Sequence, residues 1–143
     1  MASRNAGDIV MDIRTRLFPT LLRDPHPEID ALLNEMIARD FSSLGILADR
    51  LQELGLATGP LRASLRALAI EAVEFQASRR LSARTPNRFQ ITREVCRSEA
   101  LAQHDQAAVA AIQSCRSWAA LNPYEERYRG AAFERAFPSC FTE

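Results

Sequence analysis

Two glutamates stand in an otherwise apolar stretch of the chain and could do acid–base or metal chemistry. Glu71 and Glu74 are the only charged residues in the segment from 67 to 77, and neither has a cation three or four positions away. Their spacing places both on one face of a helix. Because ion pairing within the helix cannot explain them, any ionic partner has to come from another helix.

A metal site is one of three interpretations of this pair. If the helices on either side of a turn near residue 87 run antiparallel, the pair faces a set of candidate ligands on the second helix: Glu99, His104 and Asp105. Carboxylates with a histidine inside a helical bundle are typical of di-metal sites. The Glu-x-x-His pairs of ferritin-like sites are absent, however, and the chain has two histidines, His26 and His104. We therefore expect arginine ion pairs at the two glutamates and no bound metal or other cofactor, with surface exposure as the third interpretation.

A basic segment follows the glutamate pair. Six arginines against the single carboxylate of Glu94 give it a local charge of +5: Arg79, Arg80, Arg84, Arg88, Arg93 and Arg97. It could steer an acidic protein partner or contact nucleic-acid phosphates, with Phe89 stacking on a base. It could also be a solvated helix end, or pair with the acidic segment from 24 to 40, where five carboxylates oppose one arginine. The zero net charge of the chain argues against nucleic acid.

Aromatic residues gather near the C-terminus. Six of the ten lie there: Trp118, Tyr124, Tyr128, Phe133, Phe137 and Phe141. A short segment with so much aromatic area must bury it, either on its own bundle or on a partner. We assign five of them to contact with a protein partner or with a second copy of the chain: Trp118, Tyr124, Tyr128, Phe133 and Phe137.

The sequence gives little support for nucleophilic catalysis. Its widely spaced cysteines are typical of free thiols in a reducing compartment: Cys96, Cys115 and Cys140. Arg93 and Arg97 could lower the thiol pKa of Cys96, but no histidine lies within a helical turn of it. G-x-S-x-G, H-E-x-x-H, C-x-x-C and glycine-rich phosphate loops are also absent. The chain is therefore not expected to be an enzyme.

Composition narrows the class of protein further. All eighteen cationic residues are arginines, so no lysine can form a Schiff base or act as a general base. The chain is 47% apolar and 25% charged over 143 residues, which is typical of one globular domain. The longest run free of charge, from 106 to 115, is half of what a membrane span needs. We expect a cytoplasmic protein without a membrane partner.

Apolar periodicity and helix breakers predict helices throughout, and no long strand-like alternation occurs. Six segments are expected to be helical, roughly 8–23, 27–37, 44–54, 61–84, 91–121 and 123–137. Short joints between amphipathic helices make neighbours antiparallel. The predicted fold is all-α, a compact antiparallel bundle of five to six helices in a single domain over 1–143. Its parts would be an N-terminal helix and joint (1–26), the bundle core (27–121) and an aromatic-rich C-terminal helix and tail (122–143).

These features favour a non-catalytic protein–protein interaction module, such as an adaptor, small chaperone, regulator or accessory subunit of a larger assembly. It would use the aromatic C-terminal segment, with the arginine patch from Arg79 to Arg97 steering an acidic partner. One alternative is a nucleic-acid-binding protein that uses the same patch. The other is a metal-binding helical bundle built on Glu71, Glu74, Glu99 and His104.

Overall fold

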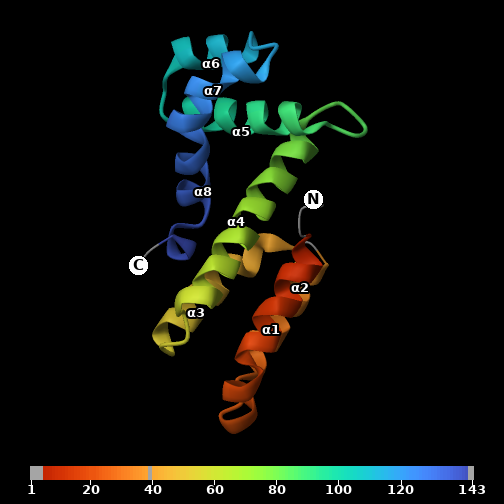
Figure 1. Cartoon of the computed structure of the whole chain (residues 1–143), viewed down its shortest axis with the longest axis vertical. Coiled ribbons are helices and arrows are strands. Elements are labelled where there is room, and N and C mark those ends of the chain that lie inside the picture. Colours follow the sequence, from red (N-terminus) through yellow and green to blue (C-terminus); the bar gives the residue numbers. More distant parts are fainter. Residues whose placement is uncertain (1–4, 39, 142–143) are drawn as a thin grey trace. The chain divides into compact units, whose positions relative to one another are not determined.

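The computed structural model describes residues 5–38 and 40–141, and the all-α class is confirmed: none of these residues forms a strand (Figure 1). The chain divides into two units. The first, which we call the N-terminal unit, runs to Ala72 and also includes the residues from Phe137 onward. The second, the middle unit, comprises Val73–Ala136. Each is described by itself below.

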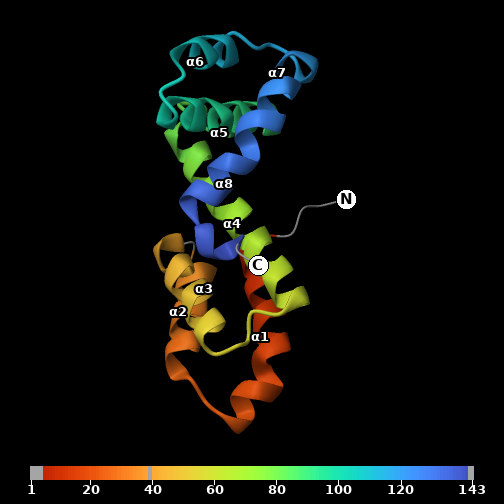
Figure 2. The same cartoon turned by 90° about the vertical axis from the view of Figure 1, so that its left-hand side faces the viewer.

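The N-terminal unit is built from helices that bury one apolar face each. They are α1 (Ala6–Arg23), α2 (Pro27–Ile37), η1 (Phe41–Ser43), α3 (Leu44–Glu53), the first part of α4 (Gly59–Arg80) and η3 (Pro138–Cys140). α1 and α2 lie side by side in both views (Figures 1 and 2). Their core residues follow a three-and-four spacing, for example Ile29, Leu33 and Met36 of α2, none of which is exposed.

Local signals read from the sequence explain several helix ends in this unit. Pro27 occupies the first position of α2, where its missing N–H is not needed. α3 ends at Glu53, and Gly55 follows with a φ of +70°, a backbone conformation that glycine adopts without steric cost. After residue 136 the chain returns to α3, where the side chain of Gln52 donates to the Ser139 carbonyl at 2.9 Å.

The middle unit contains the end of α4 and a series of shorter helices. These are α5 (Arg88–Ala102), α6 (Gln106–Gln113), α7 (Trp118–Tyr124), the π-helical turn η2 (Glu125–Arg129) and α8 (Gly130–Ala136). α6 lies beside α5 in both views (Figures 1 and 2). Their shared core consists of Cys96, Ala100, Ala108, Ile112, Cys115, Leu121 and Tyr128.

The single long helix predicted for 91–121 is wrong, and the described residues therefore form more helices than five or six. The chain leaves α5 at His104, whose φ of +60° lies in the left-handed region and cannot continue a helix. Asp105 then caps α6 by accepting from the backbone N–H of Ala108 at 3.1 Å. Ser117 caps α7 in the same way, accepting from Ala120 at 3.2 Å. Apolar periodicity persists on both sides of these breaks and so conceals them.

Over the part of the chain that the structure describes, no helix combines the length and the apolar character that crossing a bilayer requires.

Candidate partner-binding site

The basic segment is only partly available for binding, because half of its arginines hold buried glutamates of the middle unit. Glu94, which is 7% exposed, accepts two hydrogen bonds from Arg97 at 2.8 Å and one from Arg80 at 2.9 Å. Burial alone would raise the pKa of Glu94, but the bonds from Arg97 and Arg80 outweigh it and hold the pKa below its ordinary value. Glu94 is therefore an ionised carboxylate fixed between α4 and α5.

Glu74 and Glu99 have similar surroundings. Glu74, 8% exposed, pairs with Arg88 across the α4–α5 turn and with Arg129 of η2 at 3.6 Å. The ion pair expected for Glu74 is thus confirmed. Glu99, 3% exposed, accepts from Arg135 of α8 and from the Gln103 amide, both at 2.8 Å.

The metal site considered from sequence is not assembled. Within the described ranges no group of three or more His, Cys, Asp or Glu side chains is arranged to hold a metal ion. Glu74 and Glu99 are held by arginines, while His104 is exposed at the α5–α6 turn and Asp105 accepts from the Tyr128 hydroxyl. Glu71 is half-buried on α4. The metal site requires one continuous helix beyond residue 103, and the turn at His104 ends that helix.

The aromatic residues assigned to partner contact are mostly interior, so that assignment needs correction. Tyr128 has no exposed surface, and its hydroxyl donates to Asp105 at 2.7 Å. Phe133 is 3% exposed and Phe137 9%, while Tyr124 packs partly buried against the core of the middle unit. Trp118 alone among the five has a largely open side chain, at 47% exposure. η2 and α8 pack back on α5, which buries Tyr128 and Phe133 within the middle unit, whereas Phe137 belongs to the N-terminal unit.

The Trp118 side chain packs against Phe89 in the first turn of α5. Its ring meets Phe89 edge to face, with centroids 5.3 Å apart and planes at 84°. The guanidinium of Arg93 lies 5.3 Å from the centroid of the same phenyl ring. A capping box between Asn87 and Gln90 starts α5, and the four-residue spacing of Phe89 and Arg93 then places them on one face.

Arg93 and Arg116 converge beside this aromatic pair. Arg93 donates to the Cys115 carbonyl at 3.0 Å, and Arg116 donates to the same oxygen at 3.4 Å and to the Gln113 carbonyl at 3.1 Å. Gln113 is the last residue of α6 and Cys115 lies just beyond it, so both oxygens are at the C-terminal end of the helix, where positive charge is favoured. Within the described part of the chain, neither guanidinium has a carboxylate partner.

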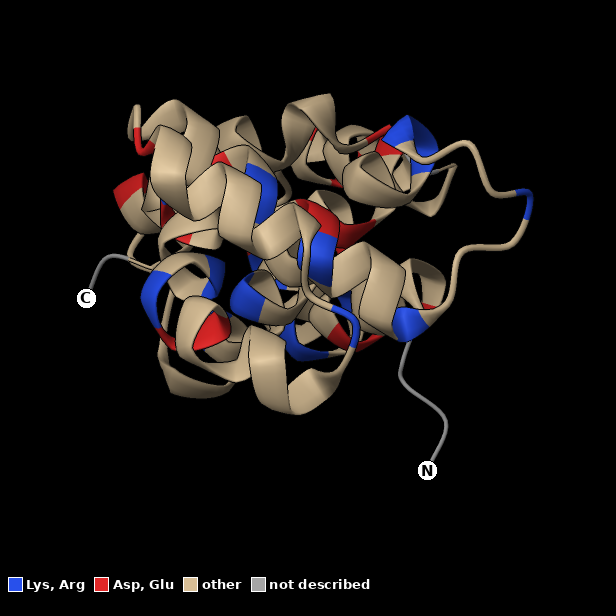
Figure 3. Ribbon diagram, turned by 90° about the horizontal axis from the view of Figure 1, so that it is seen from above, with Lys and Arg blue, Asp and Glu red and all other residues tan. Residues whose placement is uncertain are grey.

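A hollow of about 220 Å³ adjoins Arg93, and its lining residues are Leu81, Gln90, Arg93, Glu94, Arg97 and Gln113. We call Phe89, Arg93, Arg116 and Trp118 the Trp118 surface. The loop between α4 and α5 projects from the helices (Figure 3). It contributes further positive charge through Arg84, which is exposed. Arg79, also exposed, lies over the Phe75 ring at 5.8 Å.

Sequence reasoning identified three members of this surface but missed Arg116. In the nucleic-acid alternative Phe89 would stack on a base, whereas its ring is half-buried beneath Trp118 and Arg93. Arg116 lies outside the basic segment, and only the turn between α6 and α7 brings it to Arg93. A signal was present, because Arg116, Ser117 and Trp118 follow one another and Ser117 is a strong N-cap residue.

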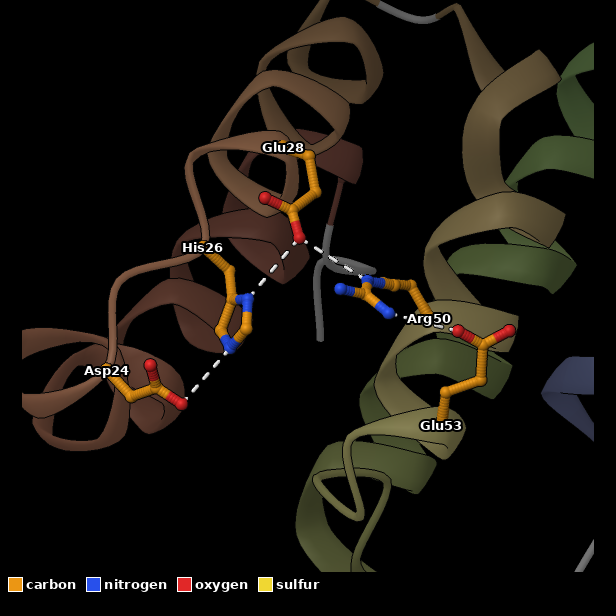
Figure 4. Close-up of polar contacts among 5 residues, drawn as sticks. All are labelled: Asp24, His26, Glu28, Arg50 and Glu53. Carbon is orange, nitrogen blue, oxygen red and sulfur yellow. Dashed lines mark hydrogen bonds and ion pairs between the residues drawn. The ribbon is translucent and has the colours of Figure 1, made fainter.

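Carboxylates of the acidic segment form ion pairs inside the N-terminal unit. His26 lies between Asp24 and Glu28, 3.4 Å from each, and Arg50 of α3 reaches Glu28 at 3.3 Å and Glu53 at 3.1 Å (Figure 4). The pKa of Glu28 lies below its ordinary value, because of a backbone hydrogen bond first and Arg50 and His26 after it. These contacts join the α1–α2 connection to α3.

The cysteine thiols are buried, which contradicts the lowered pKa considered for Cys96. Cys96 has no exposed surface, and burial raises the pKa of its thiol to about 12. Burial likewise raises the pKa of Cys140 to about 12. Their thiolates are therefore scarce at neutral pH, and the two residues serve as apolar packing.

Thiol titration of a Cys115→Ala variant should show this directly. Because both remaining thiols are buried and protonated, we expect almost no reaction with an aromatic disulfide reagent at neutral pH in the native protein. In denaturant the same sample should react fully at both sites. Reaction of the native variant at the rate of a free peptide thiol would contradict the burial of Cys96 and Cys140.

Comparison of the chain with protein-family models, with curated proteins and with solved structures finds no match.

Proposed function

We propose that this chain is a non-catalytic protein–protein interaction module that binds an acidic segment of a partner protein through the Trp118 surface. The observation that carries the proposal is an exposed indole beside two arginines that have no carboxylate partner in the described residues. Tryptophan and arginine are the residue types most enriched at binding hot spots. A partner segment would place an apolar side chain on Trp118 and carboxylates against Arg93 and Arg116.

The polar surroundings of the site support binding over catalysis. The Trp118 surface contains no histidine or thiol, and its two arginines stay cationic at every physiological pH. The adjoining hollow is lined by Leu81, by Glu94, whose carboxylate is held by Arg80 and Arg97, and by guanidinium and amide groups from Arg93, Arg97, Gln90 and Gln113. Such groups donate hydrogen bonds to carboxylates but do not exchange protons with a substrate at neutral pH.

Two observations favour an acidic protein segment over nucleic acid. Arg80, Arg88 and Arg97 already pair with Glu74 or Glu94, so the number of arginines left for phosphates is small. The Phe89 ring is covered on one side by Trp118 and on another by Arg93, which leaves it closed to a stacking base. Nucleic acid is therefore the competing outcome that the test below must distinguish.

The fluorescence of Trp118, the one tryptophan of the chain, reports on this surface directly. We expect a Glu/Asp-rich probe peptide with a central leucine to shift Trp118 emission to the blue and to bind less tightly as salt is raised. Arg93→Gln and Arg116→Gln should each weaken binding about tenfold, which corresponds to roughly 1.4 kcal/mol. Arg84→Gln, which removes the same charge outside the Trp118 surface, is the matched control and should change binding far less.

Two outcomes would overturn the proposal. The first is equal peptide affinity in the wild type and in both arginine variants, with helicity by circular dichroism unchanged in all. The second is binding of a single-stranded oligonucleotide of the same net charge more tightly than the peptide, which would transfer the site to nucleic acid.

A further inference from the structure

Helix α1 of the N-terminal unit has two apolar faces, and the chain covers only one of them. The covered face consists of Ala6, Ile9, Val10, Ile13 and Leu17, all buried. On another side of the same helix, Met11 is 53% exposed, Phe18 63% and Leu22 70%. Phe18 and Leu22 are more exposed than any other large apolar side chain in the described residues. We call Met11, Phe18 and Leu22 the α1 stripe.

The spacing of the stripe is that of a helix-pairing seam. Met11 and Phe18 are seven residues apart and Leu22 follows after four, so the three lie along one line of the helix, with Thr15 between them. A hollow of about 240 Å³ borders the line, lined by Arg14, Phe18, Leu21 and Leu22 of α1 with Asp30 of α2. An apolar side chain from a facing helix could enter this hollow.

Charge along α1 changes sign from its first half to its second. Asp8 and Asp12 lie in the first two turns, and Arg14, Arg16 and Arg23 follow. Arg14 contacts Asp30 and Asn34 of α2, and Arg16 pairs with Asp12 within the helix at 3.4 Å. A second α1 in antiparallel orientation places the acidic end of one helix beside the basic end of the other. The two helix dipoles then also oppose each other favourably, whereas a parallel pair would bring like ends together.

We infer that α1 is the interface of a homodimer, in which the α1 stripe packs against the α1 stripe of a second copy in antiparallel orientation. Met11 of one copy lies across from Phe18 of the other, and the two-fold axis passes between positions 14 and 15. α1 carries charges of both signs, and Asp12 pairs with Arg16 within the helix, so the stripe lacks the uniformly basic flank with which amphipathic helices bind an anionic membrane. A seam of three large residues per copy is small, so the dissociation constant is expected to be roughly micromolar.

Sedimentation equilibrium of the full chain over a concentration series tests the dimer. We expect the weight-average mass to rise from the monomer value of 16.0 kDa toward twice that value. A Phe18→Glu, Leu22→Glu double variant should stay monomeric throughout, with unchanged helicity because both side chains are exposed. Ile46→Glu introduces a charge at another exposed apolar position, 62% exposed on α3, and should dimerise like the wild type.

Single cysteines on α1 test the orientation. In the antiparallel register Thr15→Cys lies next to its counterpart and should form a disulfide-linked dimer on mild oxidation. Leu22→Cys lies about 22 Å from its counterpart along the axis and should not. The native cysteines are buried and do not compete: Cys96, Cys115 and Cys140.

Three results would overturn this inference. The first is that the wild type is monomeric at every concentration, and the second is that the double variant dimerises like the wild type. The third is that both cysteine variants cross-link, which indicates a parallel pair. A monomer that co-sediments with phosphatidylcholine vesicles would assign the stripe to a lipid surface instead. None of these results bears on the Trp118 surface, which is formed by other helices and has its own readout.

Discussion

Tyr128→Ala is expected to destabilise the protein by about 3–5 kcal/mol, because it removes a large side chain without exposed surface from the core of the middle unit. Cys96, Ile112 and Leu121 are buried in the same core. A cavity among helices that are held together by this residue cannot collapse cheaply. Urea unfolding, followed by circular dichroism and by Trp118 fluorescence, measures the loss.

Tyr128→Phe separates the contribution of the ring from that of the hydroxyl. It removes only the hydrogen bond to Asp105, whose carboxylate is partly exposed and can be hydrated instead. We expect a loss of about 0.5–1.5 kcal/mol. If Tyr128→Ala unfolds at the same urea concentration as the wild type but loses the acidic peptide, the aromatic segment is a contact surface as the sequence suggested, and its burial is wrong.

Glu94→Gln should give the second large loss of stability, about 1–3 kcal/mol. The substitution keeps the size of the side chain but leaves Arg80 and Arg97 without the carboxylate that they share. Removing one member of a fully buried pair costs about 3–5 kcal/mol. Because the side chains of Arg80 and Arg97 are 43% and 27% exposed, water compensates part of that cost here. Glu134→Gln, at an exposed position of α8, is the matched control and should change stability by less than about 0.5 kcal/mol.

The pH dependence of this difference has a definite sign. The pKa of Glu94 in the folded protein lies below its ordinary value of 4.5, so folding favours the ionised form. The carboxylate therefore contributes fully above pH 4.5, and its contribution is lost as the pH falls through the folded pKa. The gap between the wild type and Glu94→Gln should narrow in acid, as measured by urea unfolding at a series of pH values. A gap that stays constant or widens in acid would contradict the ion pairs.

Local sequence signals were sufficient to predict the start of α2 and the end of α3. Pro27 begins α2, and Gly55 follows α3 in the left-handed conformation that its missing Cβ permits. The break after α5 was missed although Asp105 and Ser117 are both good N-cap residues. The apolar residues on both sides of the break fit one continuous helical period, and the stretch is rich in alanine. Periodicity alone does not distinguish one long helix from two, so it predicted a single helix despite these two N-cap residues.

The sequence by itself therefore determined that this protein is helical, because backbone hydrogen bonds within a helix depend on neighbours along the chain. It also determined that any ionic partner of Glu74 has to come from another helix, since no cation lies within one turn of it. Only the tertiary structure decided which apolar residues are buried and which are exposed. Phe133 and Phe18 are equally apolar, yet one is 3% exposed and the other 63%.

The physical reason is that burial and ion pairing depend on what lies opposite a residue across the fold. Arg88 pairs with Glu74 because the α4–α5 turn brings the two side chains together. Arg93 and Arg116 instead meet at the end of α6, and among the described residues no carboxylate faces them. These contacts cannot be predicted from the spacing of residues along the chain. The shared contact of Arg93 and Arg116 with the Cys115 carbonyl at the end of α6 places two arginines beside Trp118.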